Sequence, residues 1–359
     1  MLRVRSGFLT LIQKNPNVIG TNCIIHREDL AARPVSQPLK EALDCAIKVV
    51  NYIKASALNT RLFRKLCQDM DAEYDSLLFH TSVCWLSKGN MLIRLARLLP
   101  EVIEFLKIQH KQELKTDIAD IMFQNRLAFL ADIFSHFNEL NSNLQGVGTN
   151  ILGLRDEIAA FFAKLKLWKT KIQSGQRVAV FPMMNKMNET NGKTSIVQSE
   201  AVDHFNSLIE EFQRYFPGVE HDTPMMALTR NPFRVTVEDL PNEQNKGEGI
   251  QEDFLDMIQD SIVKASFEDE SFEKFWGMME KAYPNVAETP LALLNVFPST
   301  YLCQSVFSSV VAVKTKARNT LSVLDSDLLC AISKIAPHVS SIVDKKTREK
   351  ISLIVLYKR

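Results

Sequence analysis

Cysteine and histidine stand three residues apart in the segment Cys23-Ile24-Ile25-His26, a spacing that occurs in half of a zinc site. A structural zinc ion takes four ligands, and no second pair of matching spacing follows in the sequence. The alternative is a cysteine at a strand or strand end beside a partly buried histidine. Cys23 and His26 therefore predict no metal site by themselves.

The segment 297–308, FPSTYLCQSVFS, brings several hydroxyl groups and the thiol of Cys303 together. A nucleophilic serine or cysteine needs a base and a group that orients the base, and the segment supplies neither. The acidic run 268–274, EDESFEK, is explained by the favourable interaction of carboxylates with a helix N-terminus. We therefore predict no catalytic residue, no metal and no cofactor.

Nucleic-acid-binding sites combine basic side chains, which contact phosphates, with aromatic rings, which stack on bases. The candidates are Trp85, Lys88, Arg94, Lys314, Lys316 and Arg318. A core position is the simpler explanation for the tryptophan, and a solvated helix face is the commoner explanation for the run KTKAR at 314–318. Binding to phosphates would require these cations to converge on one face and would weaken steeply with salt.

The 359 residues balance 43 Lys and Arg against 42 Asp and Glu, so the net charge is +1. This balance gives no bulk attraction to nucleic acid or to an anionic membrane. The 46% hydrophobic and 24% charged residues are typical of a globular protein. The length suggests two domains, or one domain with a large insertion.

Six cysteines are scattered along the chain without a CxxC pair, which fits free thiols in a reducing compartment. No apolar run approaches the roughly 18–20 residues that span a bilayer. The segment 1–17 has early arginines but lacks a small-residue cleavage site, so we do not interpret it as a signal peptide. We expect a soluble intracellular protein with no membrane partner and no small-molecule substrate.

Apolar residues recur at helical intervals along most of the sequence. The clearest stripe predicts a helix over about 117–145, and others are predicted over 151–171 and 200–216. Earlier helices are expected over 39–67, with a break at Asn59-Thr60, and over 91–110, with Pro100 starting a second helix. Later helices are expected over 251–265, 268–282 and from 290 onward, with breaks at Pro298 and Pro337.

Two polar stretches, 182–200 and 238–252, lack periodicity and are predicted as loops. Few segments suggest strands. The strand candidates are 18–26, 77–85, 178–181 and 234–237. The predicted fold class is therefore mainly α (α+β), with a small residual sheet that holds 18–26 and 77–85.

Several segments together resemble the hAT superfamily of cut-and-paste transposases, in particular domesticated relatives such as the zinc finger BED domain-containing proteins and general transcription factor II-I repeat domain-containing protein 2. The N-terminal matches are RSGFLTLIQKNPN, CIIHREDLAA and LLFHTSVCWLSKGNMLIRL, and the central ones are LAFLADIFSHFNELNSNLQG and EEFQRYFP. The C-terminal match is the long segment FWGMMEKAYPNVAETPLALLNVFPSTYLCQSVFSSVVAVKTKARNTLSVLDSDLLCAIS, which is similar to the hAT C-terminal dimerisation region.

The resemblance implies an RNase H-like core interrupted by an all-helical insertion. On this basis we expect a residual core segment at 1–90, the insertion at 91–289 and the C-terminal dimerisation region, which returns to the core, at 290–359. Such transposases hold divalent metal with two aspartates and a glutamate. Both aspartate positions are expected to fall before Met1, and Gln304 stands at the glutamate position, where a neutral amide is a poorer ligand.

Two further motifs of the family can be compared. Cys23 and His26 match its CxxH motif, and Cys84-Trp85 stands where the family has Arg-Trp, so the ring persists and the cation is lost. The resemblance also implies that the C-terminal region contributes dimer contacts. The candidate residues are Phe297, Tyr301, Leu302, Val306 and Phe307.

We therefore predict a truncated, catalytically inactive descendant of a hAT transposase. Its expected role is that of an interaction protein that self-associates as a homodimer or binds another protein. The alternatives are a residual nucleic-acid binder without sequence specificity, with DNA as partner, and a relic open reading frame without a selected role. A nuclear location is what the resemblance implies.

Overall fold

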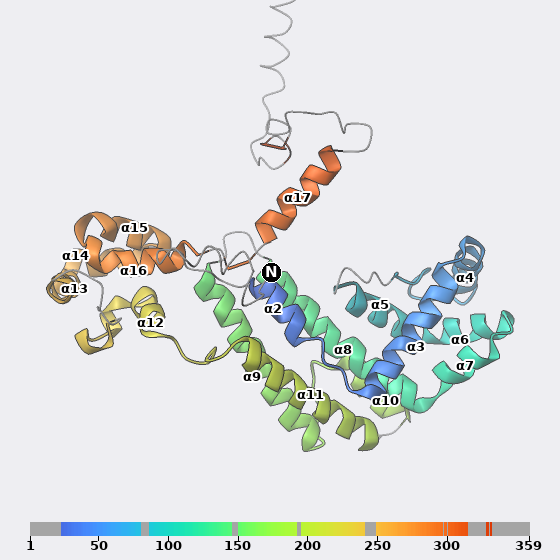
Figure 1. Cartoon of the computed structure of the whole chain (residues 1–359). Coiled ribbons are helices and arrows are strands. Elements are labelled where there is room, and N and C mark those ends of the chain that lie inside the picture. The colour runs from blue at the N-terminus through green and yellow to red at the C-terminus, as the bar shows by residue number, and fades with distance from the viewer. Residues whose placement is uncertain are drawn as a thin grey trace, which may run out of the picture. The chain divides into compact units, whose positions relative to one another are not determined.

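A computed structural model describes residues 23–79, 86–145, 150–191, 195–240, 249–296, 298–299, 301–314, 328–329 and 331. These residues form helices and connecting segments (Figure 1). The chain divides into two compact units, Met1–Ser299 and Thr300–Arg359. The mainly α class predicted from apolar periodicity is confirmed.

The helices of the first unit fall into two groups. The first group is α2 (Ile24–Ala31), α3 (Gln37–Lys54), α4 (Ala57–Asp69), α5 (Leu86–Arg97), α6 (Leu99–Ile108), α7 (Gln112–Ala119), α8 (Ile121–Leu144), α9 (Ile151–Gln173), α10 (Pro182–Asn191) and α11 (Ser195–Tyr215). The second group is α12 (Pro224–Arg230), η1 (Pro232–Arg234), η2 (Val237–Asp239), α13 (Ile250–Gln259), α14 (Ser261–Asp269), α15 (Phe272–Ala282) and α16 (Pro284–Leu294). In the second unit, α17 spans Tyr301–Val313.

No strand occurs among the described residues, so the strand predictions are wrong wherever they can be checked. Residues 24–26 begin α2, because Ile24, Glu28 and Ala31 are buried at helical spacing. Residues 77–79, 178–181 and 235–236 are extended or turn segments without a partner strand. Residues 18–22 and 80–85 lie outside the described part of the chain.

The helix predictions over 117–145, 151–171 and 200–216 are confirmed by α8, α9 and α11. Pro100 lies in the first turn of α6, as expected. The break between α3 and α4 falls at Ser56 rather than at Asn59-Thr60, because the Ser56 hydroxyl accepts the Asn59 N–H and caps α4. Asn59 and Thr60 instead donate from their side chains to the carbonyls of α3 residues 52 and 53.

The loop predicted over 182–200 is wrong, because α10 and the first turns of α11 form there. Helix α10 has no strong cap in its own sequence. Its N-terminus is capped from α8: the Asp132 carboxylate accepts the N–H groups of Met183 (3.2 Å) and Met184 (2.8 Å). A carboxylate at this position satisfies two backbone donors and complements the helix dipole.

The first group of helices packs around α8, which is buried along most of its length. Helix α5 contacts α8 at Gly89, which contributes no side chain to the contact. A Cβ atom at Gly89 would lie 2.5 Å from Asn138 Nδ2 and 2.9 Å from the Phe134 carbonyl oxygen. The close approach of the two helices therefore depends on glycine at position 89.

The second group has a separate aromatic core of Phe267, Phe275 and Trp276, the last of which donates from Nε1 to the Thr229 carbonyl at 3.0 Å. An ion pair and a hydrogen bond between side chains connect the two groups of helices. Arg230 pairs with Asp156 of α9, and Asn150 donates to Glu273 of α15 at 2.7 Å. The first unit thus contains two apolar cores connected by polar contacts.

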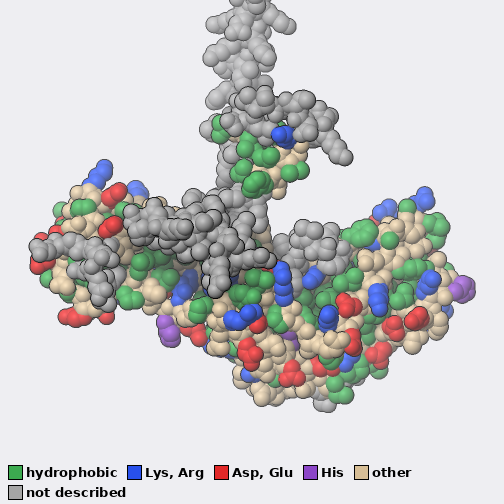
Figure 2. Space-filling model, in the orientation of Figure 1, with side chains coloured by type: hydrophobic (Ala, Val, Ile, Leu, Met, Phe, Trp, Pro, Cys, Tyr) green, Lys and Arg blue, Asp and Glu red, His purple; other side chains and the backbone are tan. Residues whose placement is uncertain are grey.

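Among the described helices, none combines the length and apolar character needed to cross a bilayer. On the visible face of the described surface, Lys and Arg side chains are interspersed with Asp and Glu (Figure 2). This mixture agrees with the balanced charge of the sequence.

Candidate functional site

Helix α17 carries several residues predicted to contribute dimer contacts. Its 13 residues, YLCQSVFSSVVAV, contain no charged side chain. Phe307 and Val311 are one helical turn apart and therefore share a face, and their exposed fractions are 69% and 72%. Val306 is half-buried. An uncharged helix with large exposed apolar side chains is a candidate contact surface.

The other predicted C-terminal residues are only partly covered. The backbone of Tyr301, Leu302 and Gln304 belongs to α17, but their side chains lie outside the described residues. Phe297 is also outside the described part of the chain. The role of Gln304 at the family's glutamate position thus stays a prediction.

The CxxH residues lie on a helix. Cys23 is half-buried at the N-cap of α2, and His26 is exposed in its first turn. No group of three or more metal-ligating side chains occurs among the residues that the structure describes. None of the three cysteines whose side chains are described, Cys23, Cys45 and Cys67, forms a disulfide. Burial raises the pKa of Cys45 and of Cys67 to about 11, so both stay protonated at neutral pH.

Two of the predicted nucleic-acid ligands have structural contacts. The Arg94 guanidinium lies 3.7 Å from the centre of the Tyr74 ring and donates to the Ser76 carbonyl at 3.0 Å. Lys88 is half-buried, and burial lowers its pKa although Asp29 and Asp44 act in the opposite direction. Lys88 and Arg94 thus have different surroundings, and a shared phosphate-binding face stays a prediction.

Of the remaining nucleic-acid candidates, only Lys314 has a described side chain. Lys314 is exposed directly after α17. Trp85, Lys316 and Arg318 lie outside the described residues. Their convergence with Lys88 and Arg94 stays a prediction.

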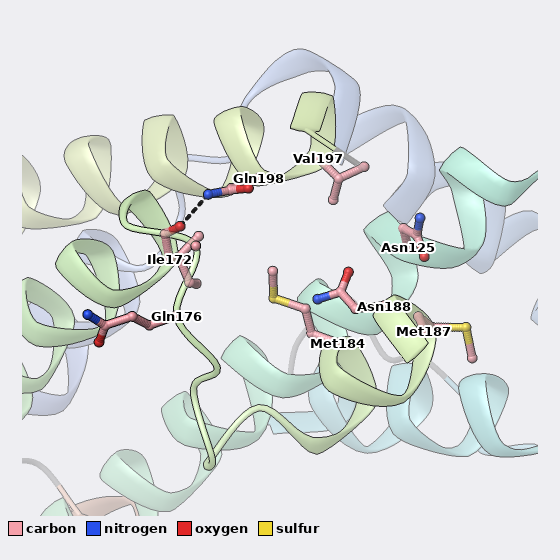
Figure 3. A pocket seen from close by; sticks show the side chains of 9 residues that line it. Asn125, Ile172, Gln176, Met184, Met187, Asn188, Val197 and Gln198 are labelled. Carbon is pink, nitrogen blue, oxygen red and sulfur yellow. Dashed lines mark hydrogen bonds between the residues drawn. The ribbon is translucent and has the colours of Figure 1, made fainter. Parts of the chain in front are cut away.

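A hollow between α8, α9, α10 and α11 is lined by amide and methionine side chains (Figure 3). Gln198 of α11 donates to the Ile172 carbonyl at its edge. The hollow measures about 30 Å³ and an adjoining one about 150 Å³. Binding sites for drug-sized ligands have volumes of roughly 300–1,000 Å³, so both hollows are smaller than such sites.

A wider groove of about 630 Å³ runs between α3, α7 and α8. Its charged lining consists of Glu41, Asp44, Lys48, Asp117, Asp120 and Arg126. The cations stand among carboxylates, and the Arg126 Nη2 is already 2.6 Å from Glu200 Oε1. The groove therefore has no excess of unpaired cations that would attract an anionic ligand.

Three buried ionisable residues escaped the sequence analysis. Burial raises the pKa of Glu28 to about 8, against the effect of its hydrogen bond from Asn141, and raises that of Asp132 to about 7. Burial lowers the pKa of His204 to about 4. The Nε2 atom of its ring forms a hydrogen bond with the Pro34 carbonyl oxygen. Each side chain joins segments that are distant in sequence, so local patterns contain no signal for them.

The helical part of the chain can be compared with known families now that its geometry is established. Residues 22–173 match the family model of the FAM200/GTF2IRD2 helical domain. That family is related to domesticated hAT transposases. The matched range runs through the end of α9 and includes α8 with the helices that pack around it. The match supports a transposase-derived origin for this part of the chain.

Proposed function

We propose that the chain is a catalytically inactive, transposase-derived interaction protein that self-associates through the C-terminal region beginning at α17. The observation that carries the proposal is the exposed Phe307–Val311 face on a helix without charge. Exposed apolar surface of this kind is removed from water most simply by contact with a second molecule. A second copy of the chain presents the same face, as a twofold interface requires.

The family match at 22–173 supports the transposase ancestry on which this proposal rests. An RNase H-like core segment at 1–90 and a hAT dimerisation region at 290–359 are further parts of the proposal. They rest on the resemblance of the N-terminal and C-terminal motifs. A nuclear location is proposed on the same ground.

Inactivity as an enzyme rests on Gln304, which supplies an amide where the family has a carboxylate. A neutral amide does not offset the cost of dehydrating Mg²⁺ or Mn²⁺. We expect no metal-dependent cleavage of duplex DNA by the full chain or by Gln304→Glu. Metal-dependent cleavage by the wild-type chain would overturn the proposed inactivity. Cleavage by Gln304→Glu alone would show that the remaining acidic ligands are present and that Gln304 is the cause of the inactivity.

Self-association is tested by size-exclusion chromatography with light scattering at low and high salt. The monomer mass is 40.8 kDa, and we expect the full chain to elute at about twice that value at micromolar concentration. Phe307→Asp and Val311→Asp place a charge in the proposed interface and should yield the monomer.

Ala312→Asp is the matched control. Ala312 is exposed on the same helix but points about 100° away from Val311, so this variant should remain a dimer. A monomeric wild-type chain, or equal effects of all three aspartates, would contradict self-association through this face. The same experiment with duplex DNA tests the nucleic-acid alternative, since a complex that dissociates with salt would favour it.

A further inference from the structure

Two arginines lie close together where α2 and α9 meet the turn after α11. The Arg27 guanidinium carbon is 4.5 Å from the centre of the Phe216 ring. Arg155 donates from Nη2 to the Gly218 carbonyl and, at 2.7 Å, to the His221 carbonyl. Burial and the nearby charge of Arg155 both lower the pKa of Arg27, so the two cations are close enough to repel each other.

Neither arginine has an anionic partner among the described residues. Arg27 is half-buried, and its side chain makes no hydrogen bond or ion pair with the described residues. Among these residues, the Arg155 side chain donates only to the carbonyls of Gly218 and His221, and its buried Nε–H has no acceptor. Arg126, which is also partly buried, instead meets the carboxylate of Glu200 at 2.6 Å. The face of an aromatic ring attracts a cation but does not neutralise its charge. The positive charges of Arg27 and Arg155, both half-buried, therefore stay uncompensated.

The local sequence supplies no anion for this pair. Residues 1–22 contain Arg3, Arg5 and Lys14 but no aspartate or glutamate. The carboxylates nearest in sequence to the pair have partners of their own. Burial raises the pKa of Glu28, which directly follows Arg27, to about 8, so this side chain is mostly protonated at neutral pH. Glu157 accepts a hydrogen bond from Asn143. Asp29 pairs with Arg33, Asp156 and Asp222 pair with Arg230, and Glu220 pairs with Lys166.

From this geometry we infer that Arg27 and Arg155 form a binding site for a phosphate monoester, carried on a phosphorylated side chain of a protein segment. A monoester carries a charge of about −1.5 to −2 at neutral pH and several acceptor oxygens, which matches two guanidinium groups. A single carboxylate would leave one positive charge uncompensated. Arginine is also the side chain best suited to bidentate contact with phosphate.

The surroundings favour one compact anion over a polynucleotide. Asp156 directly follows Arg155, and Glu220 and Asp222 flank the carbonyl ligand His221. An extended chain of phosphodiesters would pass these carboxylates, whereas a single phosphate needs contact only with the two arginines. The site does not depend on self-association through α17.

Calorimetric titration of the full chain tests the inference. The probes are an alanine pentapeptide with a central phosphoserine, the same peptide with serine or glutamate, inorganic phosphate, and a 20-nucleotide oligothymidylate. We expect the phosphopeptide to bind and the serine and glutamate peptides to bind at least about tenfold more weakly, the effect of losing a charge-assisted hydrogen bond. Inorganic phosphate should compete with the phosphopeptide.

Arg27→Gln is the decisive variant, because Arg27 makes no hydrogen bond whose loss would disturb the fold. It should weaken phosphopeptide binding about tenfold or more, and Arg27→Lys should weaken it less. Arg61→Gln removes an equally unpaired cation from exposed α4 and should leave binding unchanged. Circular dichroism confirms that each variant is folded.

Three results would overturn the inference. The first is equal binding of the phosphoserine and serine peptides, or no binding of either. The second is tighter binding of the oligonucleotide than of the phosphopeptide with the same loss in Arg27→Gln, which would assign the site to a polynucleotide. The third is binding of inorganic phosphate without the phosphopeptide, which would assign it to a free anion.

Discussion

Arg230 of α12 forms a bidentate ion pair with Asp156 of α9, with Nη2–Oδ1 and Nη1–Oδ2 distances of 2.5 and 2.8 Å. The Nε atom of the same arginine lies 2.8 Å from Asp222 Oδ2. The Arg230 side chain thus connects the second apolar core to α9 of the first core. Bidentate geometry makes such a pair stronger than a single contact.

Replacing this arginine should loosen the connection between the cores. Arg230→Met retains much of the stem and loses both ion pairs, and we expect a cost of about 1 kcal/mol because the carboxylates are partly exposed. Amide hydrogen exchange should accelerate in α13–α16 and stay unchanged in α8. Arg214→Met, which loses contacts with Glu211 and Tyr215 that lie within α11, should have no effect on this exchange. Unchanged exchange in Arg230→Met would show that other contacts hold the cores together.

The crossing of α5 and α8 gives a second prediction. Gly89→Ala places a methyl group against the Phe134 carbonyl, and backbone cannot rotate away as a side chain can. Overpacking of this kind costs about 1–3 kcal/mol, measurable as a lower midpoint in urea unfolding. Gly277→Ala is the matched control, because its Cβ would meet nothing within 4 Å. Alanine there should be neutral or stabilise α15 by up to about 1 kcal/mol.

Glu28 makes the stability depend on pH. Burial raises its pKa from the ordinary value of 4.5 to about 8 in the folded protein. Between these values the folded state keeps a proton that the unfolded state releases, so the free energy of unfolding should fall as the pH rises from about 4.5 to about 8. Glu28→Gln, which resembles the protonated acid, should reduce this decline by on the order of a few kcal/mol.

The measurement for Glu28 is urea unfolding at pH 5.5 and pH 8.5. Glu139→Gln is the control, because the Glu139 side chain is 67% exposed, and it should keep the wild-type pH dependence. A wild-type chain whose stability is equal at the two pH values would contradict the prediction.

Arg94 gives a test of structural against nucleic-acid contacts. Arg94→Lys loses stacking on Tyr74 and the bond to the Ser76 carbonyl, so we expect destabilisation of about 1 kcal/mol in thermal or urea unfolding. The exposed change Arg61→Lys should be neutral. If Arg94→Lys left stability unaltered and weakened binding to duplex DNA, the nucleic-acid role would be restored.

Long helices with a continuous apolar stripe were predictable from the sequence. The spacing of Phe123, Leu127, Leu130, Phe134 and Phe137 predicts one buried stripe of α8. It does not predict the burial of residues 128, 129, 131 and 133 outside this stripe, which follows from the packing of other helices around α8. The helix α10 was not predictable in this way. Its sequence PMMNKMNETN is polar, and its N-terminal cap comes from Asp132.

The same distinction between local patterns and contacts distant in sequence applies to the candidate sites. Phe307 and Val311 belong to one local pattern, so the apolar character of their helix could be recognised in advance. Arg27 and Arg155 are 128 positions apart in the printed sequence, and both contact the turn after α11 only in the folded chain. The strand prediction at 24–26 is wrong because the buried residues Ile24, Glu28 and Ala31 follow helical spacing, which is seen only when residues beyond 26 are included.

The cap on α10 has a consequence for the order in which the chain folds. Asp132 and Met184 are separated by 52 positions, and a helix of ten residues is marginal in water without outside support. As the polypeptide leaves the ribosome, α8 is complete long before its carboxylate has a helix to cap. We therefore expect residues 182–191 to become helical late, after the packing of α9 against α8 has brought them back to Asp132.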